Sequence, residues 1–261
     1  MPFAEATGAR IFWRSDGAPN GPPLLLLNSI GTDLHSFDDC LPFLAPRFCI
    51  VRMDTRGHGK SDAPPGDYHL SALAQDVIAV MDAAGLAKAA IAGVSLGGMM
   101  AMQLALDHPA RVNSLIVICS SATIDAPTWS ARVAAVRKDG TAKIAQMAME
   151  RYFSPAFAMS NAERVAEIRK AFIEMSDHGY AGAGAAIRDM AIATELWRIK
   201  QSMLVIAGDR DISTPFEGHG RFIVDRAPKA AAARVDAAHL AQIEAPEQVA
   251  ALIREFVENR A

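Results

Sequence analysis

Short, almost wholly apolar runs are the feature that most constrains how this chain can fold. Residues 24–27 are four consecutive leucines, which is too apolar a run for a strand with one face in water. Such a run is typical of a parallel sheet that helices cover on both faces. The leucines belong to a run over residues 22–28, and similar runs recur at residues 9–14, 48–54, 89–94, 112–120, 203–208 and 232–236. We predict a strand at each of them, and we expect the one at residues 9–14 to pair with the segment before it.

Amphipathic helical patterns lie between these runs. Apolar side chains recur at helical spacing over residues 70–81, and Gly85 then supplies a C-terminal stop. A last helix is predicted to begin near Pro246, because proline fits the first turn of a helix. Strands that alternate with helices in this way predict an α/β fold with a doubly wound, mostly parallel sheet.

One long segment breaks the alternation. Residues 122–197 contain no strand-like run, only helical patterns separated by turn residues. We interpret this segment as a helical cap that is inserted between two strands and lies over one edge of the sheet. The predicted organisation is a core in two parts, residues 1–121 and 198–261, with the cap between them.

Composition and charge exclude several classes of protein. Of the 261 residues, 51% are hydrophobic and 21% are charged, which suits a globular domain and not a disordered chain. The net charge is −3 and no long run of Lys or Arg is present, so we expect neither nucleic acid nor a membrane surface as a partner. The sequence leaves open whether the chain forms a homo-oligomer.

The sequence also predicts where the protein works. No apolar run approaches the roughly 18 residues that a membrane-spanning helix needs, and no basic segment precedes an apolar one at the start. The three cysteines, Cys40, Cys49 and Cys119, are widely spaced and form no CxxC pair. We therefore predict a reduced, cytoplasmic setting, and no metal ligand among the cysteines.

The most informative motif is G-x-S-x-G, in Gly93-Val94-Ser95-Leu96-Gly97. It follows a predicted strand and precedes a predicted helix over residues 99–107. In a tight strand-to-helix turn, flanking glycines let neighbouring backbone segments come close, and the serine hydroxyl projects above the sheet. We interpret Ser95 as a nucleophile. The alternative is a glycine-rich turn that only packs.

A serine nucleophile needs a base, and the base needs a carboxylate to orient it. His239 follows a predicted strand and precedes the last helix, at the edge where open α/β sheets bind ligands. Asp211 follows another predicted strand and is our choice for the acid. Asp209 is the alternative, and we expect whichever aspartate does not reach the imidazole to be solvated or paired with Arg210. The order serine, aspartate, histidine is that of the α/β-hydrolases.

The other histidines fit the role of base less well. His58 sits in a glycine turn, and His108 ends a predicted helix. The rest lie in segments that we expect to be polar or solvated: His35, His69, His178 and His219.

Residues 57–61 end in G-K-S, like a phosphate-binding P-loop. The full motif requires glycine where this chain has Asp54, and it requires a helix that starts at the lysine. Pro64 and Pro65 exclude that helix, so we expect no nucleotide binding.

Two segments resemble those of a known family. Residues 54–61, D-T-R-G-H-G-K-S, look like the D-x-R-G-x-G-x-S turn of α/β-hydrolases, and residues 93–99 resemble their nucleophile elbow. More narrowly, residues 28–34 (N-S-I-G-T-D-L), 95–99 (S-L-G-G-M) and 129–132 (W-S-A-R) resemble the 3-oxoadipate enol-lactonases of aromatic-compound breakdown. The resemblance covers essentially the whole chain. Where many α/β-hydrolases carry His-Gly, this chain has Asn28-Ser29, as in the lactonase-like pattern.

The resemblance implies an α/β-hydrolase fold and a serine hydrolase that opens an enol-lactone ring to give 3-oxoadipate, with no metal or organic cofactor. It also implies that the backbone N–H groups of Ile30 and Leu96 form the oxyanion hole. The implied substrate is a small anionic lactone, whose carboxylate is costly to bury without a cation.

The predicted cap offers several cations for that carboxylate: Arg132, Arg137, Lys138, Arg151 and Arg188. We prefer Arg132, because Trp129 lies on the same helix face at i, i+3 and the two could cover a small anionic ring. The alternative is an Arg132 that only caps or solvates a surface helix.

Two other activities use the same motifs. A carboxylesterase, or a carbon–carbon-bond hydrolase of ring-cleavage products, would have the same triad, since insertion side chains set substrate choice. A non-catalytic ligand-binding protein of this fold could also retain all three residues.

Overall fold

The computed structural model describes residues 2–259, so Met1, Arg260 and Ala261, which fall in the predicted core ranges, lie outside the described residues. Its centre is a sheet of eight strands in the order β1-β2-β4-β3-β5-β6-β7-β8. The strands are β1 (Phe3–Ala6), β2 (Ala9–Gly17), β3 (Pro23–Leu27), β4 (Cys49–Met53), β5 (Ala89–Val94), β6 (Val112–Ile118), β7 (Ser202–Gly208) and β8 (Ala230–Val235).

Most of the sheet is parallel. Strand β2 runs antiparallel to both β1 and β4, and every other neighbouring pair is parallel. All six residues of β5 are buried, and the four leucines of β3 are at most 1% exposed. The apolar runs therefore do lie in strands that are covered on both faces, and the predicted fold class is confirmed.

Helices of the core cover both faces of the sheet. They are α1 (Leu41–Leu44), α2 (Leu70–Ala83), α3 (Leu96–Asp107), α9 (Gly220–Val224), α10 (Ala241–Glu244) and α11 (Pro246–Glu258). Across the sheet, the connection from β3 to β4 runs toward the β1 edge. The connections from β4 to β5, from β5 to β6 and from β7 to β8 run toward the β8 edge. Because such crossovers are right-handed, α1 lies on one face, and α2, α3 and α9 lie on the other. Helix α11 packs beside α1 on its face.

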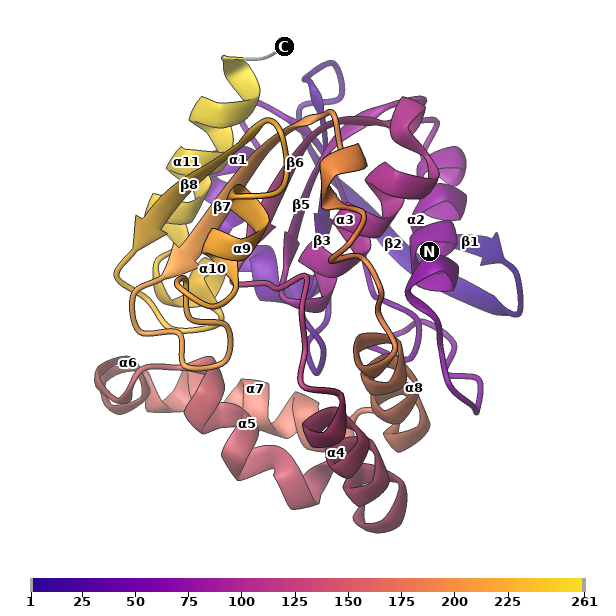
Figure 1. The fold of residues 1–261 in the computed structure, drawn as a ribbon, viewed down its shortest axis with the longest axis vertical. Helices are drawn as coiled ribbons and strands as arrows, with labels where there is room; N and C mark the ends of the chain where they lie inside the picture. Colours follow the sequence, from indigo (N-terminus) through magenta and orange to yellow (C-terminus); the bar gives the residue numbers. More distant parts are fainter. Residues whose placement is uncertain (1, 260–261) are drawn as a thin grey trace.

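The insertion between β6 and β7 is helical. It contains α4 (Ala126–Asp139), α5 (Ala145–Tyr152), α6 (Pro155–Ser160), α7 (Ala162–Glu174) and α8 (Asp177–Arg188). Figure 1 shows these helices as a separate layer at the bottom of the view, across the carboxyl ends of the strands. The exact division into residues 1–121, 122–197 and 198–261 stays a prediction.

Short elements escaped the sequence analysis. They are α1, α9, α10 and the 3₁₀ turns η1 (Leu34–Cys40), η2 (Pro109–Arg111), η3 (Thr141–Ile144) and η4 (Leu196–Arg198). Helix α3 begins at Leu96, three residues before the predicted start, because Ser95 is its N-cap and the glycines after it join the first turn. Within residues 2–259, no helix has the length and apolarity needed to cross a bilayer.

Candidate active site

The serine of G-x-S-x-G sits in a strained turn between β5 and α3. Its backbone angles are φ 55° and ψ −113°, a conformation that side chains other than glycine rarely adopt. The turn closes tightly, since a Cβ on Gly93 would lie 2.2 Å from the carbonyl oxygen of Gly97. The Ser120 hydroxyl donates to the Ser95 carbonyl at 2.6 Å and helps to hold this geometry. The residue that follows the neighbouring strand and the flanking glycines therefore hold Ser95 in its strained backbone conformation.

His239 and Asp211, from the loops after β8 and β7, meet as predicted. Nδ1 of His239 lies 2.9 Å from Oδ2 of Asp211, and both side chains are buried. Asp211 also accepts hydrogen bonds from the backbone N–H groups of Ser213 and Thr214, at 2.8 and 3.0 Å, and from the Thr214 hydroxyl at 2.6 Å. The carboxylate is thus fixed from several sides.

Burial alone would raise the pKa of Asp211, but the nearby charge and hydrogen bonds outweigh it. The positive charge that His239 can carry, its hydrogen bond and those of Thr214 lower the pKa of Asp211 to about 2. Asp211 is therefore ionised at neutral pH. An ionised acceptor requires a proton on Nδ1 of His239, which leaves Nε2 as the basic nitrogen.

The alternative acid, Asp209, lies elsewhere. It pairs with Arg234 at 2.5 Å on the surface, and Arg210 pairs with Asp236 at 2.7 Å. Of the two outcomes expected for the unused aspartate, Asp209 is exposed to solvent and is not paired with Arg210; its ion pair is with Arg234. The catalytic roles of Ser95, Asp211 and His239 remain predictions, which the strained turn at Ser95 and the Asp211–His239 contact support.

The loop after β3, which carries Ile30, is held by buried hydrogen bonds. The Asn28 side chain donates to the carbonyls of Ser29 and Thr32, and its oxygen accepts from the backbone and hydroxyl of Thr55. Asparagine at position 28 thus fixes the turn through its own amide. Within the described residues, the N–H groups of Ile30 and Leu96 donate to no other group, as an oxyanion hole requires.

A fully buried histidine supports the same loop. Nε2 of His58 accepts from the Gly31 N–H at 3.0 Å, and Nδ1 lies 3.1 Å from the Arg56 carbonyl, to which it donates. Burial lowers the pKa of His58 to about 4, so the ring is neutral. The glycine turn at residues 57–61 therefore supports the candidate oxyanion loop. No helix begins at its lysine, as a P-loop would require, and the next helix is α2.

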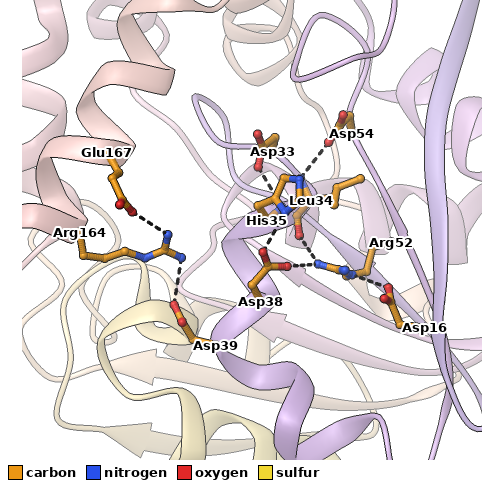
Figure 2. Close-up of polar contacts among 10 residues, drawn as sticks. All are labelled: Asp16, Asp33, Leu34, His35, Asp38, Asp39, Arg52, Asp54, Arg164 and Glu167. Carbon is orange, nitrogen blue, oxygen red and sulfur yellow. Dashed lines mark hydrogen bonds and ion pairs between the residues drawn. The ribbon is translucent and has the colours of Figure 1, made fainter. Parts of the chain in front are cut away.

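Further along, Arg52 anchors the segment that follows this loop. Figure 2 shows its guanidinium between Asp16, 2.9 Å away, and Asp38, 2.5 Å away, while it also donates to the Leu34 carbonyl. The Leu34 N–H in turn donates to Asp54 at 2.9 Å. A core strand thereby fixes the chain just beyond the candidate oxyanion hole.

Ser95 and His239 open into one cavity of about 230 Å³ between the core and the cap. Ile30 also lines it, as do both predicted substrate-binding residues, Trp129 and Arg132. The guanidinium of Arg132 lies 4.6 Å from the centre of the Trp129 ring. The cavity is smaller than the roughly 300–1,000 Å³ of pockets for drug-sized ligands, so it suits a small molecule.

Two guanidiniums of the cavity have no acidic partner. Neither Arg132 nor Arg151 forms an ion pair with any of the residues that the structure describes. Arg137 and Arg188, the other arginines considered for the substrate, both pair with Asp67 outside the cavity. The cavity therefore offers two free positive charges to an anion.

Tyr152 and His219 are among the cavity residues that the sequence analysis missed. The hydroxyl of Tyr152, from cap helix α5, donates to the Ile30 carbonyl at 2.5 Å, and its ring stacks on His239 with centres 6.2 Å apart. His219, expected in a polar or solvated segment, is half-buried and lines the cavity. Neither stands beside a recognisable motif, so the sequence held no signal for them.

The described residues contain no cluster of three or more His, Cys, Asp or Glu side chains that could bind a metal ion. The chemistry that this geometry can perform with its own groups is acyl transfer, in which a serine attacks a carbonyl and a histidine–aspartate pair moves the proton.

Comparison with known proteins agrees with this fold. Residues 22–246 match the family described as the alpha/beta hydrolase fold. The chain belongs to this family. The α/β-hydrolase is 33% identical over 232 residues to 3-oxoadipate enol-lactonase 2 of Acinetobacter baylyi, covering 88% of this chain and 86% of that protein.

Solved structures extend the similarity to the cap. The α/β-hydrolase superposes with a TM-score of 0.95 on an enol-lactonase from Burkholderia xenovorans LB400, at 30% identity, covering 98% of this chain and all of that one. A hydrolase from Pseudomonas aeruginosa PA01 gives a TM-score of 0.94 at 36% identity, with coverage of 98% and 97%. The sequence resemblance to enol-lactonases was therefore well founded at the level of family.

Proposed function

We propose that this α/β-hydrolase opens the ring of 3-oxoadipate enol-lactone to give 3-oxoadipate, as a step of aromatic-compound catabolism in the cytoplasm. The observation that carries the proposal is one small cavity that contains Ser95, His239 and two unpaired guanidiniums. A neutral ester has no use for those charges, whereas a lactone with a free carboxylate does. The similar enol-lactonases, one of which superposes over 98% of this chain, support the same substrate.

In this mechanism Ser95 attacks the ring carbonyl while Nε2 of His239 takes its proton. The oxyanion forms between the N–H groups of Ile30 and Leu96, which are free to donate. The ring oxygen leaves as an enolate, which is a better leaving group than an alkoxide. A water molecule, activated by the same histidine, then releases the acyl group from Ser95.

The substrate carboxylate binds the cap side of the cavity. Arg132 and Arg151 supply the charge, and the ring of Trp129, 4.6 Å from the Arg132 guanidinium, covers an apolar face of the lactone. A hydrogen bond to a charged group contributes about 1.5–3 kcal/mol, so either arginine is worth roughly 10- to 100-fold in binding.

The test compares kcat/KM for the enol-lactone with that for a neutral aryl ester of similar size. We expect the lactone to be strongly preferred, and Arg132→Gln and Arg151→Gln to weaken lactone turnover more than ester turnover. Arg137→Gln is the matched control, since Arg137 pairs with Asp67 away from the cavity. A wild-type preference for the neutral ester, or equal losses on both substrates, would overturn the proposal in favour of an esterase.

A further inference from the structure

The cavity contains a second imidazole that the proposed ring opening does not use. His219 lines it together with Ser95 and His239, and belongs to the loop between β7 and α9. Its Nδ1 lies 2.7 Å from the hydroxyl of Ser121, which follows the neighbouring strand β6. One ring nitrogen is therefore held, on a residue that lines the same cavity as Ser95.

The surroundings of Ser121 fix which nitrogen of His219 carries the proton. The Ser121 oxygen lies 2.5 Å from the Thr123 carbonyl, and it also accepts from the Thr123 N–H at 3.0 Å. A carbonyl can only accept, so the one hydroxyl proton of Ser121 must point to it. Nδ1 of His219 is then the donor to Ser121, and we assign the proton of the neutral ring to Nδ1.

Nε2 of His219 is left with a lone pair. Among the described residues no group donates to it. Burial lowers the pKa of His219, so the neutral form is favoured before a ligand binds. The site thus contains two imidazoles with the same tautomer, one braced by the carboxylate of Asp211 and the other by the hydroxyl of Ser121.

A free lone pair on a residue that lines a binding cavity can accept from a donor on the ligand, and the anionic enol-lactone itself has no O–H or N–H group. Ring opening creates one, because the ring oxygen leaves as an enolate and becomes an enol hydroxyl on taking up a proton. We propose that His219 is a second base of this site, which takes the enol proton and delivers it to the neighbouring carbon. This inference rests on the proposed function and extends it to the ketonisation of the product.

The step needs no other reactant. The enol O–H bond breaks and its proton goes to Nε2, while the oxygen electron pair forms the carbonyl. The former C=C electron pair takes the proton from Nε2 and forms a C–H bond, and the ring returns to its neutral tautomer. One base can serve both positions, because the oxygen and the carbon are separated by a single atom.

The experiment is carried out with the whole enzyme and the enol-lactone in D₂O, quenched early. Deuterium then enters the former ring alkene carbon. Deuterium NMR in a chiral liquid crystal resolves the two enantiomers of the product. A base fixed in the cavity delivers deuterium to one face, so we expect a large excess of one enantiomer from the wild type.

His219→Asn is the decisive variant. Its amide can still donate to Ser121 where Nδ1 does, but it places no basic atom at Nε2, so the local structure is preserved while the base is removed. We expect the enantiomeric excess to be lost, because ketonisation then occurs in solution. His178→Asn, which removes an exposed histidine of the cap, is the matched control and should keep the wild-type excess.

Each outcome decides the matter. A racemic product from the wild type, or an undiminished enantiomeric excess from His219→Asn, would overturn the role of His219. Neither result would contradict the proposed lactonase function. No disappearance of the lactone with wild-type enzyme would instead overturn the proposed function, and the second base would fall with it.

Discussion

One carboxylate, Asp211, decides which nitrogen of His239 faces the cavity. It is ionised at neutral pH because, against the effect of burial, the charge that His239 can carry and the hydrogen bonds of His239 and Thr214 lower its pKa to about 2, and it binds Nδ1 at 2.9 Å. Without a negative acceptor there, the imidazole loses both its orientation and the stabilisation of its charged form during the reaction.

Asp211→Asn should therefore lower kcat by on the order of 10³- to 10⁴-fold while leaving KM for the lactone nearly unchanged. Steady-state kinetics on the purified variant measures both. Asp209→Asn is the matched control, because Asp209 lies in the same turn but pairs with Arg234 on the surface. If the two variants lost activity equally, Asp211 would not be the orienting acid.

The buried His58 predicts a pH dependence of stability with a definite sign. Its pKa falls from 6.5 to about 4 on folding, because burial disfavours the charged ring. Between those values the unfolded chain binds more protons than the folded one, so this contribution is complete above pH 6.5 and is lost as the pH falls towards 4. Asp54, with its pKa raised to about 6 by burial, acts in the opposite direction.

Comparing the wild type with His58→Gln separates the contribution of His58 from that of Asp54. The glutamine oxygen can still accept from the Gly31 N–H, but the side chain does not titrate. We expect the free energy of unfolding, from urea titrations between pH 5 and 8, to decline more steeply on acidification in the wild type than in the variant. Parallel curves would mean that His58 is not buried in neutral form.

At the scale of elements, the close approach of α3 to β3 shapes the site. A Cβ on Gly97 would lie 2.4 Å from the Leu27 carbonyl oxygen and 2.9 Å from that of Asn28. The helix that begins after Ser95 can therefore reach the candidate oxyanion loop only because position 97 has no side chain.

Gly97→Ala should destabilise the protein by about 1–3 kcal/mol, as overpacking does, and should reduce kcat by displacing the loop that carries Ile30. Thermal and urea unfolding measure the first effect and steady-state kinetics the second. Gly218→Ala is the control, since its Cβ would meet no atom within 4 Å. Equal stability of the two variants would contradict the tight packing.

Elements with a strong period or an uninterrupted apolar run could be predicted, and short ones could not. The leucines of β3 and the stripe of α2 are buried in the sheet and against it, so their pattern reflects the core. Short elements such as η1, with seven residues, and α10, with four, depend on tertiary contacts, as when Arg52 binds the Leu34 carbonyl. Local sequence carries too little of that information.

The same contrast holds within the site. Ser95, Asp211 and His239 could be selected because each follows a predicted strand, and parallel strands bring their carboxyl ends together. His219 and Tyr152 could not, because they reach the cavity through the path of a loop and the docking of the cap. Residues that reach the site only because the cap packs on the core show no periodic pattern in the sequence.

At the scale of the whole molecule, the cap is joined to the core at several points around the cavity. Asp67 of the core binds both Arg137 of α4 and Arg188 of α8. On the far side, Arg164 of α7 pairs with Asp39 at 3.0 Å, as Figure 2 shows. Tyr152 links the cap to Ile30 in between. These contacts hold the cap over the carboxyl ends of the strands.

Asp67→Asn should test the outer contacts. Because exposed ion pairs contribute about 1 kcal/mol or less, we expect little change in the global free energy of unfolding but faster amide hydrogen exchange in α4 and α8. Exchange in β5 and β6 should stay as in the wild type. Unchanged exchange in the cap helices would show that these pairs do not restrain it.

The central claim is that Ser95 is a nucleophile activated within this fold, and covalent labelling tests it most directly. Intact-protein mass spectrometry after treatment with a fluorophosphonate should show one adduct on the folded wild type and none on Ser95→Ala. A wild type that stays unlabelled, or an adduct that persists in Ser95→Ala, would contradict the account and favour a binding protein that only retains the triad.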